Sequence, residues 1–184
     1  MIIGITGTLG AGKGTVVKYL VENQGFKHMS ARAFFQEQME KEGIPVNRDT
    51  MIEFANSLRA KYGGDYVFRE LFKKAEAVGG DVVIESLRTV GEAKALKENE
   101  GALLLAVDAD QQLRYERIHG RGSPLDQVTF EKFVEQENTE MRSDDEHKQN
   151  IAAVMDLADH TIYNDNNTEA LFREVEAFLE NARS

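Results

Sequence analysis

The sequence predicts a three-layer α/β domain, in which a mainly parallel sheet of five strands lies between layers of helices. The first observation is that short apolar runs alternate with amphipathic segments along all 184 residues. The second is a glycine-rich turn at residues 7–15, which joins the first strand directly to the first helix. The third is a nearly continuous apolar run at residues 102–107, the pattern of a strand that helices cover on both faces.

Composition excludes several classes of site and partner. Hydrophobic residues make up 41% of the chain and charged residues 29%, which is typical of one globular domain spanning residues 1–184. The net charge of -10 argues against binding DNA or RNA, whose phosphates require a basic face. The absence of cysteine excludes disulfides and cysteine-based zinc sites. With no signal peptide and no run of membrane-spanning length, we expect a cytoplasmic monomer or small homo-oligomer.

The glycine-rich turn has the spacing of a P-loop, which wraps the phosphates of a nucleotide. Gly7, Gly12 and Lys13 match that pattern, but Gly14 stands where Ser or Thr is usual, and the hydroxyl comes one residue later, at Thr15. Glycines let successive N–H groups converge on an anion, the following helix adds its dipole, and the lysine reaches the β- and γ-phosphates. The alternative is a turn that binds nothing, against which the flanking strand and helix argue.

Apolar runs and turn signals predict the other elements. Strands are expected near residues 2–6, 26–29, 82–85, 102–107 and 160–163. The first helix should end before Gly25, because glycine commonly follows a helix. Ser30 is a suitable N-cap for the next helix, and Asp49 for one that begins at Thr50. Residues 31–78, between the second and third strands, should therefore form a helical insertion.

Two charged residues near the middle of the chain are candidates for binding. Glu85 ends the expected strand 82–85, and ligands bind at the carboxyl ends of strands in open α/β sheets. A carboxylate there can order Mg²⁺ through water. Arg59 lies near a helix end beside a glycine turn, where it could bind a phosphate or equally stabilise the helix C-terminus.

A pair of arginines forms the second distinctive pattern. Arg117 and Arg121 are four residues apart, on one face of a predicted helix. Two neighbouring cations repel each other unless an anion binds between them, and phosphoryl transfer depends mainly on positioned positive charge. The charge-rich residues at about 122–148, including a helix that ends near Met141, should form a mobile lid.

These motifs resemble those of the adenylate kinase group of nucleoside monophosphate kinases. That group commonly has the Gly-Lys-Gly-Thr of residues 12–15, and its Arg-Ile-x-Gly-Arg matches residues 117–121 position for position. Residues 85–89 are similar to its Asp-Gly-Phe-Pro-Arg-Thr, with one residue fewer. The order of elements matches over nearly the whole chain. The group usually has Gly-Asp where this chain has Ala31 and Arg32, and this departure leaves the acceptor open.

Residues 158–164 also resemble the last strand of dephospho-coenzyme A kinases and of archaeal adenylate-kinase-related proteins, in which the following loop lies near the donor adenine. A dephospho-coenzyme A kinase requires a base near a ribose hydroxyl, whereas an acceptor phosphate requires arginines. No clearly placed Asp offers that base, which favours a monophosphate acceptor. A regulatory ATPase or switch is the alternative from another class, although the guanine-reading Asn-Lys-x-Asp motif is absent.

The resemblance implies a P-loop NTPase fold with a helical acceptor lobe at about 31–78, a short helical lid at about 122–148, and transfer of a phosphoryl group from ATP, with Mg²⁺, to a nucleoside monophosphate. The expected catalytic residues are Lys13, Arg88, Arg117 and Arg121. The expected ATP-binding residues are Gly7, Gly10, Ala11, Gly12, Lys13, Gly14, Thr15, Arg117 and Asn164. The expected acceptor-binding residues are Ser30, Arg32, Arg59 and Arg88, and the Mg²⁺ ligands are Thr15 and, through water, Glu85.

Overall fold

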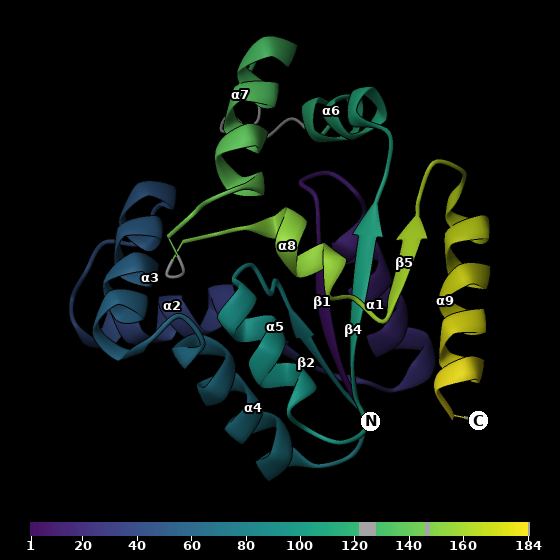
Figure 1. Cartoon of the computed structure of the whole chain (residues 1–184), viewed down its shortest axis with the longest axis horizontal. Helices are drawn as coiled ribbons and strands as arrows, with labels where there is room; N and C mark the ends of the chain where they lie inside the picture. The colour runs from purple at the N-terminus through teal and green to yellow at the C-terminus, as the bar shows by residue number, and fades with distance from the viewer. Residues whose placement is uncertain (122–127, 146–147, 184) are drawn as a thin grey trace.

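The computed structural model describes residues 1–121, 128–145 and 148–183 of the chain (Figure 1). Within these ranges the sheet has five strands, in the order β2-β3-β1-β4-β5, and all neighbouring strands run parallel. The strands are β1 (Ile2–Gly7), β2 (Lys27–Ser30), β3 (Val82–Glu85), β4 (Ala102–Asp108) and β5 (His160–Tyr163). The predicted fold class is therefore confirmed, with a sheet that is fully parallel.

Helices cover both faces of this sheet, as the apolar strands require. They are α1 (Lys13–Gln24), α2 (Ala31–Lys41), α3 (Arg48–Tyr62), α4 (Tyr66–Val78), α5 (Val90–Lys97), α6 (Gln111–His119), α7 (Phe130–Met141), α8 (Ile151–Asp156) and α9 (Thr168–Arg183). Helices α1 and α9 pack on one face, in a cluster that includes Ile3 and Leu105. Helices α2 to α5 and α8 share the other cluster, with Ile84 and Leu104. The helical insertion therefore has a common core with the sheet.

Two predicted helix ends are confirmed and one is corrected. Gly25 ends α1 in the left-handed conformation, with φ of 74°. The hydroxyl of Ser30 accepts a hydrogen bond from the Ala33 N–H (3.3 Å) at the start of α2. Helix α3 begins two residues earlier than expected, because Asn47 and Thr50 form a reciprocal capping box that replaces the expected Asp49 cap.

Two further features were not predicted. Helix α8 has only six residues, too few to show a helical period, but its Val154 is fully buried against the sheet. Asn167, rather than Thr168, caps α9 by accepting a hydrogen bond from the Ala170 N–H (2.9 Å).

Helices α6 and α7 lie beyond the carboxyl ends of the strands, which are the arrowheads in Figure 1. The expected lid falls partly outside the description, which omits residues 122–127 and 146–147; its described part contains α7. Helix α7 packs on α6 through Phe133, which is buried against Tyr115. In the part of the chain that is described, no helix has both the length and the apolar character needed to cross a membrane.

Candidate active site

The glycine-rich turn has the conformation that a P-loop requires. Gly7 and Gly12 have φ values of 131° and 104°, which other residues rarely adopt. A side chain at Gly7 would overlap the carbonyl group of Val107 in the neighbouring strand, and one at Gly12 would overlap the amide of Asn164. Both positions therefore depend on glycine for space as well as for backbone conformation.

Lys13 is folded back onto its own loop. Its Nζ atom donates hydrogen bonds to the carbonyl oxygens of Gly7 (2.8 Å) and Thr8 (2.7 Å). Burial, and then the neighbouring charge of Arg88, lower the pKa of Lys13 to about 7, against the opposing effects of Glu85 and Glu140. A phosphate that binds Lys13 would therefore replace the carbonyl oxygens of Gly7 and Thr8 as its hydrogen-bond acceptors.

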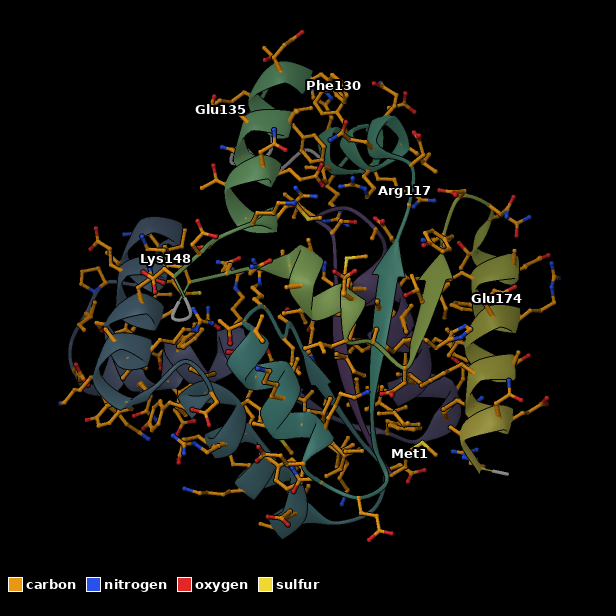
Figure 2. The ribbon with its side chains drawn as sticks, viewed as in Figure 1. Met1, Arg117, Phe130, Glu135, Lys148 and Glu174 are labelled. Carbon is orange, nitrogen blue, oxygen red and sulfur yellow. The ribbon has the colours of Figure 1, made fainter. Side chains whose placement is uncertain are left out.

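A cavity of about 370 Å³ lies beside the loop, between the end of α6 and the segment after β5. It is lined by Gly10, Gly12, Thr15, Arg117, Arg121, Asn164, Asn166, Asn167, Thr168 and Leu171. The Nη1 atom of Arg117 is buried and has no hydrogen-bond partner among the described residues. Figure 2 shows Arg117 at the end of α6, above the sheet. Arg117 and Arg121 therefore give the wall of this cavity a positive charge, which suits an anionic ligand.

The structure thus brings together most of the residues predicted to bind ATP. Asn164 joins the segment after β5 to the P-loop, because its Nδ2 atom donates to the carbonyl oxygen of Ala11 (2.8 Å). Gly14 has open space where a side chain would stand, so nothing in the ligand-free loop requires glycine there. Its predicted contact with phosphate stays a prediction.

Glu85, at the carboxyl end of β3, contacts the side chain of His28 from the neighbouring strand β2. The Nε2 atom of His28 lies 3.0 Å from Oε2 of Glu85. This hydrogen bond lowers the pKa of Glu85 against the opposing effect of burial, and the charges of His28, Lys13 and Arg88 lower it further. An ionised Glu85 and the exposed hydroxyl of Thr15 are hard oxygen donors, which fit Mg²⁺. The described residues contain no cluster of three metal-ligating side chains, so phosphate oxygens would have to complete the coordination.

Arg88 lies in the turn after β3, and its side chain reaches Glu140 of α7. The turn itself is anchored, because the backbone N–H of Arg88 donates to Oε2 of the buried Glu92 (2.7 Å). The guanidinium donates to Oε1 of Gln149 (3.0 Å) and pairs with Oε2 of Glu140 at 3.5 Å. The Arg88 guanidinium is therefore held by two polar side chains that do not belong to the sheet, and its charge acts on Lys13.

The other predicted acceptor residues have different surroundings. The hydroxyl of Ser30 caps α2, and Arg32 is exposed in the first turn of that helix. Arg59 is only 3% exposed, and its Nη2 atom lies 3.3 Å from Oε1 of Glu92. The guanidinium of Arg59 is thus paired with a buried carboxylate, and its Nε atom is buried without a hydrogen-bond partner among the described residues. Its role in the acceptor site stays a prediction.

Arg114 is a site residue that the motif analysis missed. It is buried, and it donates to the carbonyl oxygens of Ala109 (2.8 Å) and of Leu9 in the P-loop (3.1 Å). Its Nη1 atom also pairs with the buried Glu137 of α7. One guanidinium therefore links the P-loop, the turn after β4 and helix α7. Its position three residues before Arg117, on the same helical face, was the available signal.

Comparisons with known proteins agree with this fold. A family model described as "AAA domain" matches residues 3–144. A UPF0200 protein of Thermococcus sibiricus is 30% identical over 98% of this chain and 94% of its own length. The structure of TT1252 from Thermus thermophilus has a TM-score of 0.64 and 21% identity, and the match covers 98% of this chain and 97% of that one. Shikimate kinase from Acinetobacter baumannii, in complex with shikimate, has a TM-score of 0.60 and 17% identity, with coverages of 98% and 93%.

These matches support a P-loop, kinase-like fold, while membership of the adenylate kinase group in particular stays a prediction. By the family model and the curated relative, the chain belongs to the UPF0200 protein family and, over residues 3–144, to the family described as AAA domain.

Proposed function

We propose that this protein transfers the γ-phosphoryl group of ATP to the phosphate of a nucleoside monophosphate, in a reaction that requires Mg²⁺. The observation that carries this proposal is the position of Arg88. Its guanidinium lies near the P-loop lysine and is held by Glu140 and Gln149, polar side chains that an anion can replace. A cation in that position suits an acceptor that arrives as a phosphate.

On the donor side, the triphosphate would lie along the P-loop and the nucleoside in the cavity beside it. Lys13 would exchange the carbonyl oxygens of Gly7 and Thr8 for phosphate oxygens, and Arg117 and Arg121 would approach from α6. Thr15 and Glu85 would hold Mg²⁺, which when bound neutralises charge on the β- and γ-phosphates.

On the acceptor side, the reaction requires alignment more than proton transfer. An acceptor phosphate is already anionic, so it needs cations to hold it rather than a base to activate it. The mutual repulsion of Lys13 and Arg88, which helps to lower the pKa of Lys13, would be relieved when phosphates bind between them. The binding of both substrates is therefore favoured by the same charges that are costly in the ligand-free site.

Dephospho-coenzyme A kinase activity is the second candidate. The observation in its favour is the carboxylate of Glu140, which lies on Arg88 and acts electrostatically on Lys13, and so could serve as a base for a hydroxyl acceptor. A kinase of similar fold is bound to shikimate, which is not a nucleotide. Acceptors other than monophosphates therefore belong in the test.

A coupled assay with ATP, Mg²⁺, a panel of monophosphates and dephospho-coenzyme A tests the proposal. With the best acceptor, we expect Arg88→Ala to raise the acceptor KM by about tenfold to a hundredfold, with a smaller effect on the ATP KM, because a charge-assisted contact is lost. Arg173→Ala, an exposed arginine on α9, is the matched control. An unchanged acceptor KM and kcat in Arg88→Ala would remove the acceptor-phosphate role from this residue.

Nucleotide binding should also take up a proton at alkaline pH. With a pKa of about 7, Lys13 is mostly neutral at pH 8 in the free protein, and phosphates would raise its pKa and return the charge. We expect uptake of close to one proton at pH 8, measured from binding enthalpies of a non-hydrolysable ATP analogue in buffers of different ionisation enthalpy. Lys13→Arg should lack this uptake, because arginine stays charged. Equal uptake by the two proteins would assign the proton to another group.

A further inference from the structure

The lid helix α7 turns acidic side chains towards the site. Glu137 and Glu140, one turn apart on this helix, both pair with arginines of the sheet's carboxyl end. Glu137 pairs with Arg114, and both side chains are buried. Glu140 pairs with Arg88, and both side chains are partly exposed. The two contacts therefore differ in how easily a ligand can reach and replace them.

Glu140 contacts Arg88, the residue on which the proposed function places the negatively charged acceptor phosphate. Its Oε2 atom is 3.5 Å from Nη1 of Arg88, and its charge also acts on Lys13. A carboxylate paired with Arg88 resembles, in charge and in hydrogen-bonding capacity, part of a phosphate group. A partly exposed ion pair of this length is weak and sensitive to salt, so an incoming anion can displace it.

We infer that Glu140 occupies the acceptor-phosphate position in the ligand-free protein, as a built-in competitor that the acceptor must displace from Arg88. This inference rests on the proposed function, because it takes Arg88 as the acceptor-phosphate site. It adds that the C-terminal end of α7 is tied to Arg88 and is released when the acceptor phosphate binds. Phosphate binding and lid position are then coupled through one guanidinium.

The other contacts of α7 limit the movement. Phe130 packs edge-on against Tyr115 of α6, and Phe133 is buried beside the same ring. Together with the buried Glu137–Arg114 pair, these contacts hold the first two turns of the helix on α6. Displacement of Glu140 therefore frees the last turn of α7, and the rest of the helix stays anchored.

The test compares Glu140→Gln with Glu135→Gln. Glu135 is exposed on the same helix, on the side away from α6 in Figure 2, and pairs only with Lys132 among the described residues. Each protein is saturated with a non-hydrolysable ATP analogue and Mg²⁺ to fill the P-loop, then titrated with inorganic phosphate by calorimetry. We expect Glu140→Gln to bind phosphate about threefold to tenfold more tightly than wild type, and Glu135→Gln to match wild type.

Arg88→Ala separates the two proposals. If it binds phosphate as wild type does, the acceptor site itself is misplaced and the proposed function fails. If Arg88→Ala loses phosphate binding but Glu140→Gln gains none, only the competitor role of Glu140 is overturned. A collapse of kcat in Glu140→Gln with a hydroxyl acceptor, without a gain in phosphate affinity, would also overturn it and would make Glu140 the base.

A second readout does not depend on a stable Glu140 variant. In the wild-type protein, hydrogen exchange of residues 138–142 should become faster when phosphate is added to the analogue-bound protein, because the last turn of α7 loses its contact with Arg88. Exchange in residues 130–134, which the aromatic contacts hold, should not change. Unchanged exchange at residues 138–142 would contradict the displacement.

Discussion

Replacing Lys13 with alanine is expected to lower the rate of phosphoryl transfer by about a hundredfold or more, while the protein stays folded. The rate falls because the cation that meets the β- and γ-phosphates is lost. The fold persists because the hydrogen bonds of Lys13 Nζ to the described residues go to two carbonyl oxygens of its own loop, and alanine is a good first residue for α1.

Lys18→Ala is the matched control for this variant. Lys18 lies on the same helix, but its side chain is 70% exposed and pairs only loosely with Glu22, at 3.9 Å. Steady-state rates and thermal unfolding midpoints of both variants should be measured together. Near-normal turnover by a folded Lys13→Ala protein would refute the P-loop assignment.

The sheet and most helix ends could be predicted because their causes are local. A strand covered on both faces must be apolar along its length, as residues 102–107 are, and a glycine such as Gly25 marks a helix end by its own conformation. Helix α8 could not be predicted, because six residues show no period and only burial of Val154 against the sheet explains it. The early start of α3 depends on a choice between neighbouring caps, Asn47 and Asp49, that short-range pattern does not decide.

In the site, too, features with local causes could be predicted and features that depend on distant residues could not. The glycines, Lys13 and the pair Arg117 and Arg121 could be found from spacing, and the structure gathers them around one loop and one cavity. The position of Arg59 could not be predicted, because its partner Glu92 lies 33 residues away in the sequence. Arg59 supports the site indirectly, since Glu92 holds the backbone of the Arg88 turn.

Arg121 is the residue for which we expect the second large effect. Arg121→Ala should lower kcat and kcat/KM together, by about a hundredfold to a thousandfold, because charge that develops during transfer loses a positioned cation. Arg121 lines the same cavity as Arg117, although it lies two residues beyond the end of α6 and its side chain is exposed. Its exposure in the ligand-free protein means that it gives little to the fold, so the loss should fall on catalysis.

The kinetic pattern separates a transition-state contact from ordinary nucleotide binding. Arg121→Lys should recover only part of the activity, since an ammonium keeps the charge but loses the planar fork that contacts two oxygens. Arg173→Ala, an exposed arginine on α9 that lies outside the cavity lining, should behave as wild type. Rates measured with each substrate varied in turn decide the matter. If Arg121→Ala raises the ATP KM and leaves kcat unchanged, Arg121 binds the donor equally in the ground state and the transition state.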